Sequence, residues 1–166
     1  MTKEIPLTQG KTALIDDEDY PLVSQYKWYA KNNGNTWYAA TCHRGNRNLQ
    51  IQQLILGGRG YDHVDGDRLN NTRKNLRKAT TQQNSWNRRK MINRDSSKYK
   101  GVQIQNNYRY KISWISRIYA NGKQYYLGSF NTEIEAAKAY DAKALELFGD
   151  FAWLNFPIEK SRIKED

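Results

Sequence analysis

Hydrophobic and polar residues alternate over much of the first half of the chain, a period that predicts short β-strands. Turn signals separate these strands, and Gln9-Gly10 and Asn33-Gly34-Asn35 each predict a hairpin. Acidic residues 16–19 stand before an apolar run and predict the first turn of a short helix. Residues 48–56 then predict a strand that runs into a short helix, which ends at the glycine-rich stretch 57–60.

The middle of the chain has a different order of signals. Residues 61–64 predict a strand, residues 65–72 a polar loop, and residues 75–79 a returning strand. Thr80, or the threonine after it, is a good N-cap for a helix that is predicted to run through Lys90. The sequence therefore predicts a compact unit of strand, strand and helix.

The last third of the chain predicts a second folding unit. Three strands are expected at 99–105, within 108–120 and at 123–127, with Asn121-Gly122 as a hairpin turn. A capping-box pattern then opens a helix whose apolar residues recur every three or four positions. The fold class expected for the whole chain is α+β.

Charge is distributed unevenly along the chain. The net charge is +10, and residues 73–100 hold ten basic residues and one acidic residue. Such a run can be an ordinary solvated face, but its position beside the candidate chemistry described below favours a polyanionic partner such as nucleic acid.

Other features of the composition indicate the cell compartment of the protein. No apolar stretch approaches the ~20 residues that a membrane span needs, and no export signal is visible at the N-terminus. The single cysteine, Cys42, excludes an internal disulfide and is expected as a half-buried strand residue. We therefore expect a cytoplasmic protein without a membrane partner; the resemblance described below implies that the cell is bacterial or phage-infected and that the protein associates with the nucleoid.

Three polar residues in the middle segment have the chemistry of phosphodiester hydrolysis, which needs an activated water and a cation near the phosphate. His63 can take a proton from water, and Asp62 can hold a divalent cation. Asn84 could supply a second oxygen ligand, and two oxygen ligands suit Mg²⁺ or Mn²⁺ better than zinc. An ordinary polar turn is the alternative. Neighbours on a strand point to opposite faces, so Asp62 and His63 can share one site only where the strand ends.

Residues 54–87 resemble the HNH nuclease motif of phage- and intron-encoded homing endonucleases. The matching residues are Leu54-Ile55-Leu56, Asp62-His63-Val64-Asp65-Gly66-Asp67, Leu69-Asn70-Asn71, Asn75-Leu76-Arg77, Thr80, Gln83-Asn84 and Asn87. The resemblance implies a ββα-metal core within about residues 51–92, preceded by short antiparallel strands.

In this motif His63 is implied to be the general base, Asp62 and Asn84 the metal ligands, and Asn75 a brace for the loop that also orients His63. Asparagine in place of a second histidine makes the site an H-N-N variant. Many relatives carry a histidine ahead of the site at the position of Gln52, which is a departure from the pattern.

Residues 98–157 resemble the Apetala/ethylene-response-factor (ERF) DNA-binding domain, in which a three-stranded antiparallel sheet packed on one helix enters the major groove. The matching residues are Tyr99-Lys100-Gly101-Val102, Asn121-Gly122-Lys123, Tyr126-Leu127-Gly128-Ser129-Phe130, Thr132, Glu135-Ala136-Ala137, Ala139-Tyr140-Asp141 and Leu154-Asn155-Phe156-Pro157. Glutamines on the first strand would favour adenine over guanine.

The expected DNA contacts combine the basic segment with the sheet of the second unit. They are Arg73, Lys74, Arg77, Lys78, Arg88, Arg89, Lys90, Arg94, Lys100, Gln103, Gln105, Arg109, Lys111, Arg117, Tyr119 and Lys123.

We predict an HNH nuclease domain at 1–92, a basic linker at 93–98, an ERF-like domain at 99–158 and a charged tail at 159–166. The predicted function is site-specific cleavage of double-stranded DNA with Mg²⁺ or Mn²⁺, by a monomer or a homodimer. Two alternatives remain at this point: a non-catalytic DNA-binding regulator, and an RNA-binding or ribonucleolytic protein.

Overall fold

The computed structural model describes residues 1–34, 36–43, 46–90, 97–107 and 110–157. The chain divides into two compact units, residues 1–85 and residues 86–166. Most of the expected linker and the expected charged tail lie outside the described residues. In the described part the fold is mixed, with several small antiparallel sheets and few helices, as expected.

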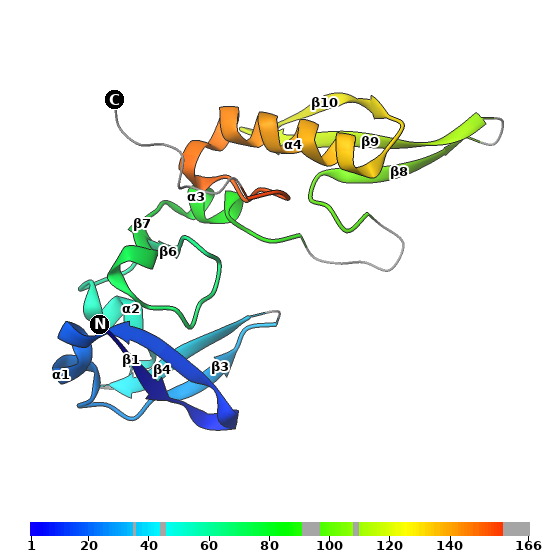
Figure 1. Cartoon of the computed structure of the whole chain (residues 1–166). Coiled ribbons are helices and arrows are strands. Elements are labelled where there is room, and N and C mark those ends of the chain that lie inside the picture. The colour runs from blue at the N-terminus through cyan, green and yellow to red at the C-terminus, as the bar shows by residue number, and fades with distance from the viewer. Residues whose placement is uncertain (35, 44–45, 91–96, 108–109, 158–166) are drawn as a thin grey trace. The chain divides into compact units, whose positions relative to one another are not determined.

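The first unit begins with two antiparallel sheets (Figure 1). The first is a hairpin of β1 (Thr2–Pro6) and β2 (Thr12–Asp16), which turns at Gln9-Gly10 as predicted. The second sheet has the order β3-β4-β5, and its first hairpin turns at the predicted asparagine-glycine segment. Its strands are β3 (Tyr29–Asn32), β4 (Trp37–His43) and β5 (Asn46–Gln50).

Short helices connect and cover these sheets. The acidic run forms a 3₁₀ turn (Asp17–Asp19) that leads into α1 (Tyr20–Val23). After β5 the chain enters α2 (Ile51–Ile55), where Gln50 and Gln53 form a reciprocal capping box. The core of the unit lies between the hairpin and these helices, because their apolar side chains face one another. It contains Ile5, Ala13, Ile15, Val23, Trp28, Ala39, Ile51 and Ile55.

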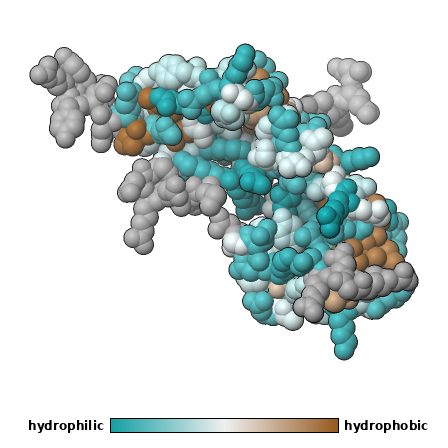
Figure 2. Space-filling view, turned by 180° about the vertical axis from the view of Figure 1, so that it is seen from behind, coloured by the Kyte–Doolittle hydropathy of each residue, from teal (hydrophilic) through white to brown (hydrophobic). Residues whose placement is uncertain are grey.

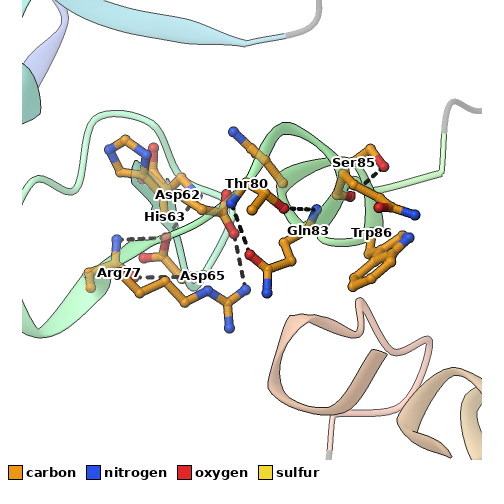
Figure 3. A network of polar contacts seen from close by, with 12 residues as sticks. Asp62, His63, Asp65, Arg77, Thr80, Gln83, Ser85 and Trp86 are labelled. Atoms are coloured by element: carbon orange, nitrogen blue, oxygen red, sulfur yellow. Dashed lines mark hydrogen bonds and ion pairs between the residues drawn. The ribbon is translucent and has the colours of Figure 1, made fainter. Parts of the chain in front are cut away.

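The predicted strand, strand and helix follow in that order. They are β6 (Tyr61–His63), β7 (Leu76–Lys78) and α3 (Thr81–Trp86), and β6 pairs antiparallel with β7. Thr80 caps the helix, because its Oγ1 accepts from the amide of Gln83 while the Gln83 side chain accepts from the amide of Thr80 (Figure 3).

The helix ends at Trp86, earlier than the predicted end at Lys90. The reason is that the carbonyl oxygens of Trp86 and Arg88 accept hydrogen bonds from Lys100 Nζ, each at 2.8 Å. The Trp86 ring also stacks on Phe148, with ring centroids 4.6 Å apart. Trp86 therefore belongs to the second unit, and the structure divides the chain after Ser85 rather than at the predicted residue 92.

The second unit is a three-stranded antiparallel sheet and one long helix (Figure 1). The sheet has the order β10-β9-β8 and consists of β8 (Val102–Asn107), β9 (Tyr110–Ala120) and β10 (Lys123–Phe130). The helix α4 (Glu133–Phe148) begins with the predicted capping box of Thr132 and Glu135. A 3₁₀ turn (Gly149–Phe151) follows it.

One face of the sheet packs on α4. Ile118 and Ala120 of β9 form a core with Tyr140, Ala144 and Phe148 of the helix. The segment after the helix is fixed by Asp141, whose carboxylate accepts from the amides of Asn155 (2.9 Å) and Phe156 (2.8 Å). The opposite face of the sheet is therefore left for other contacts.

The surface is mostly hydrophilic on the face that Figure 2 shows, in keeping with a mean hydropathy of −0.96. In the described part of the chain, no helix is long and apolar enough to span a membrane. Cys42 lies on β4 as predicted, but its side chain is exposed rather than half-buried.

Candidate active site

Asp62 and His63 are consecutive residues on β6, and both are buried, with exposed fractions of 0% and 1%. The strand ends at His63. Both side chains reach one guanidinium: Arg68 Nη1 lies 2.8 Å from Asp62 Oδ1 and 3.3 Å from His63 Nδ1. The end of the strand thus allows neighbouring side chains to converge on one point.

The buried carboxylate of Asp62 has two arginine partners. Arg68 donates to Oδ1, and Arg77, which lies opposite Asp62 on β7, donates to Oδ2 at 3.0 Å (Figure 3). A buried carboxylate requires such pairing, because removing it from water without a partner is costly. Arg77, an expected DNA contact, therefore holds Asp62 instead.

The hydrogen bonds of His63 fix the tautomer of its ring. Arginine has only donors, so His63 Nδ1 must present its lone pair to Arg68. His63 Nε2 then carries the proton and donates to Asn71 Oδ1 at 3.1 Å. Burial lowers the pKa of His63 below its ordinary value of 6.5, although the hydrogen bond to Asn71 opposes this effect. The Nδ1 lone pair of His63 therefore faces Arg68, and the lowered pKa favours the neutral form of the ring.

Asn75 braces the loop between β6 and β7. Its side-chain amide donates to Asp65 Oδ1 (2.9 Å) and to the carbonyl of Asn70 (2.7 Å), and its Oδ1 accepts from the amide of Asp65 (3.0 Å). The side chain that contacts the His63 imidazole is Asn71, which the sequence motif contains but to which we had assigned no role. A contact eight residues away in a loop has no periodic signature, so only the folded loop reveals it.

The loop is also anchored to the first hairpin. The amide of Leu14 on β2 donates to the carbonyl of Leu69 (2.8 Å), and the amide of Asn71 donates to the carbonyl of Leu14 (2.7 Å). Arg73 adds a bidentate ion pair with Asp19, at 3.0 and 2.6 Å. The N-terminal strands therefore hold in place the loop that positions His63.

Asn84 projects from α3 to the same point. Arg68 Nη2 donates to Asn84 Oδ1 at 3.2 Å, so the expected metal ligands Asp62 and Asn84 share one guanidinium. A cavity of about 100 Å³ opens beside them, lined by His63, Arg68 and Asn84. Gln52 is buried and lines the same cavity.

The donor set of the site fits a cation. The oxygens of Asp62 and Asn84 accept from the Nη1 and Nη2 atoms of one guanidinium, so both face the same positively charged group. Among the described residues, no group of three or more histidine, cysteine, aspartate or glutamate side chains could hold a metal ion. A metal in this site would therefore rely on one carboxylate and one neutral amide.

Several expected DNA contacts have partners inside the protein. Arg73 is held by Asp19 and Glu18, and these carboxylates raise its pKa. Lys100 Nζ is bound to two backbone carbonyls, and burial lowers its pKa to about 8. Lys90 donates to the carbonyl of Ser97, and the Arg89 guanidinium lies 4.9 Å from the centre of the Trp153 ring.

Other expected contacts are exposed. Lys74 and Lys78 in the first unit and Arg88 and Lys123 in the second have exposed side chains without a hydrogen bond or ion pair to another described residue. Arg94 and Arg109 lie outside the described residues, as does the side chain of Lys111.

The sheet face that points away from α4 carries the remaining expected contacts. Directly opposed residues on paired antiparallel strands share a face. Gln124 lies opposite Tyr119, and Tyr126 lies opposite Arg117. Gln103 and Gln105 on β8 extend the same face, on which Tyr119 is 66% exposed. The residues named on this face are thus mostly amides and aromatic rings, with Arg117 as the one charged side chain among them.

Comparison with known proteins places this chain in a family. The sequence matches none of the models of known protein families. It is similar to a protein of Acanthamoeba polyphaga mimivirus that is named an uncharacterized HNH endonuclease, with 37% identity over 151 residues, 87% of this chain and 74% of that protein. The chain belongs to the HNH endonuclease family.

The HNH-family chain is also similar to plant proteins. Two AP2-like ethylene-responsive transcription factors of Arabidopsis thaliana are 27% identical over 87% of the chain and 46% identical over 38% of it. The chain spans 29% and 12% of their respective lengths. Together with the mimivirus protein, these plant proteins agree in general terms with the resemblances to the HNH motif and to the ERF domain.

Proposed function

We propose that this HNH-family protein is a DNA endonuclease that uses one divalent cation and His63 as general base. The observation that carries the proposal is the convergence of buried Asp62, buried His63 and half-buried Asn84 on one cationic group beside a cavity. Family membership supports the same reaction class. We assign β6, β7 and α3 as the ββα-metal core.

In this proposal His63 Nδ1 accepts the proton of the attacking water, because that nitrogen carries the lone pair. Asn71 keeps the ring in the required tautomer by accepting from Nε2. Asp62 and Asn84 would hold Mg²⁺ or Mn²⁺, and the bound ion would stabilise negative charge on the phosphate oxygens and leaving group. Asn75 is a positioning residue that acts through the loop.

The substrate in this proposal is double-stranded DNA, held by the second unit. The amide- and tyrosine-rich sheet face of Gln103, Gln105, Arg117 and Tyr119 would contact bases, and exposed lysines and Arg88 would contact phosphates. The similarity to AP2-like transcription factors supports this role. One active site per chain would nick one strand, so a double-strand break requires a homodimer or a second event.

The test is cleavage of a supercoiled plasmid library with Mg²⁺ or with EDTA. We expect nicked circles from the native protein with Mg²⁺ only, and none from His63→Ala. His43→Ala is the matched control, because it removes the chain's other histidine. Equal cleavage by His63→Ala and the native protein would exclude the proposed base.

A non-catalytic DNA-binding regulator is the second candidate, and a specific observation favours it. Arg68 already satisfies Asp62 and Asn84, as it would in a site that no longer binds metal. Under this alternative neither the native protein nor His63→Ala cuts with any divalent metal, yet both retard duplex DNA in a gel.

A further inference from the structure

Arg68 lies at the centre of the candidate active site, although the sequence motif assigns it no role. Its guanidinium touches the three side chains expected to do the chemistry: Asp62 Oδ1 at 2.8 Å, His63 Nδ1 at 3.3 Å and Asn84 Oδ1 at 3.2 Å. Its side chain is only 11% exposed. The residue is therefore a built part of the site rather than a surface arginine that happens to lie near it.

The contacts of Arg68 use the atoms that a divalent cation would need. An oxygen that accepts from a guanidinium at 2.8 Å cannot coordinate a metal at the 2.0–2.1 Å that is typical of Mg²⁺ in the same direction. With Arg77 on the second oxygen of Asp62, the only carboxylate among the expected ligands is already paired twice. A metal must displace Arg68 before both expected ligands become available.

The geometry points to Arg68 as an internal cation that occupies the metal position and competes with the divalent ion for Asp62 and Asn84. This inference rests on the proposed function, because it concerns the same metal site. Its physical basis is that Arg68 and a divalent ion would use the same two oxygens, Asp62 Oδ1 and Asn84 Oδ1, while Arg77 keeps its ion pair with Asp62 Oδ2.

The surroundings give the displaced side chain a place to go. The cavity beside the site holds about 100 Å³, and Arg68 itself lines it together with Arg59, Tyr61 and Gln53. A guanidinium that leaves Asp62 can enter this polar space without crossing an apolar barrier. There it could bind a phosphate in the bidentate manner that its planar fork allows.

The experiment measures metal binding directly, without reference to cleavage. Mn²⁺ is titrated into the full-length protein, and free Mn²⁺ is followed by electron paramagnetic resonance. We expect Arg68→Ala to bind Mn²⁺ more tightly than the native protein by about tenfold or more, because the ion no longer breaks charge-assisted hydrogen bonds. Arg68→Gln removes the same charge in a closer shape and should do the same, so it replaces Arg68→Ala if that variant does not fold.

The matched control is Arg59→Ala. It removes one positive charge from the same cavity, but Arg59 makes no hydrogen bond or ion pair to Asp62 or Asn84 in the described structure. Its affinity for Mn²⁺ should change by less than about threefold, because an exposed charge is screened. Asp62→Asn should lose binding in either background and so identifies the site.

The outcomes separate the inference from the proposed function. Tighter binding by both Arg68 variants but not by Arg59→Ala supports the competition, whether or not the protein cuts DNA. Unchanged or weaker binding by both Arg68 variants overturns it, even if the native protein nicks DNA in Mg²⁺. Equal tightening by Arg59→Ala also overturns it, because general charge repulsion would then suffice.

Discussion

The ion pair between Arg73 and Asp19 allows a direct test of the way in which the first unit supports its site. Asp19 is only 4% exposed, and the Arg73 guanidinium donates to both of its oxygens, at 3.0 and 2.6 Å. Arg73 was expected to contact DNA, but its partners tie it to the N-terminal segment. We predict that Arg73→Ala lowers the stability of the first unit and leaves the salt dependence of DNA binding unchanged.

The size of the effect follows from the contacts. Each hydrogen bond to a charged group contributes about 1.5–3 kcal/mol, so two contribute roughly 3–6 kcal/mol before solvent screening. Because the Arg73 side chain is 47% exposed, we reduce this by about half, to about 2–3 kcal/mol. Without Arg73 the Asp19 carboxylate would stay buried and lose its strongest partner. The loss of stability should therefore be larger than that for an exposed surface ion pair.

Two assays read the result. Urea unfolding followed by circular dichroism gives the free energy of unfolding. Amide exchange of Leu14 and Asn71, whose backbone bonds join β2 to the loop, should become about 30-fold faster or more, since 1.4 kcal/mol corresponds to a factor of ten.

Lys74→Ala is the matched control, because Lys74 is the next residue along the chain, exposed and basic. It should change stability by less than about 0.5 kcal/mol and reduce the salt slope of duplex binding by about one. The reasoning is refuted if Arg73→Ala unfolds like the native protein and weakens DNA binding as Lys74→Ala does.

Three further predictions concern the second unit. Gly101→Ala should destabilise this unit by about 3–5 kcal/mol, because a methyl group there would lie 1.9 Å from a Tyr140 ring carbon. The control Gly122→Ala has the same φ of +77° and nothing within 4 Å, so it should cost only about 1–2 kcal/mol. Equal losses of stability in urea unfolding would contradict this prediction. Lys100 has a pKa of about 8 in the folded protein and 10.5 when unfolded, so between these values the unfolded chain binds more protons and stability rises with pH. The unfolding free energy of the native protein relative to Lys100→Met should therefore increase by at most about 3 kcal/mol between pH 8 and pH 10.5, and parallel curves would show that the lysine is not buried. When duplexes that bind the protein are selected from a random pool, Gln103→Arg should change the preference at one position from adenine towards guanine. An unchanged preference would show that Gln103 does not contact that base.

Local rules determined many elements from the sequence. Asparagine-glycine turns set the hairpins at residues 33–34 and 121–122, because the left-handed conformations of Gly34, Asn121 and Gly122 suit tight turns. The capping boxes at Thr80 and Thr132 set the starts of α3 and α4. In each box, the side chains of two residues three positions apart accept hydrogen bonds from each other's backbone amides. The neighbours Asp62 and His63 and the later Asn84 could be selected as a site from residue chemistry and the resemblance.

Tertiary structure decided which charges pair, because pairing depends on distance in space and not on distance along the chain. It brought Arg68 onto Asp62 and Asn84, and Asn71 onto His63, through a loop without periodicity. It also gave the cations of Arg73 and Lys100 internal partners. The sequence alone determined that the chain is basic, that it contains an Asp-His pair and that it forms two folding units. Only the fold decided which cation the buried carboxylate holds, since a buried charge must take the partner that packing delivers.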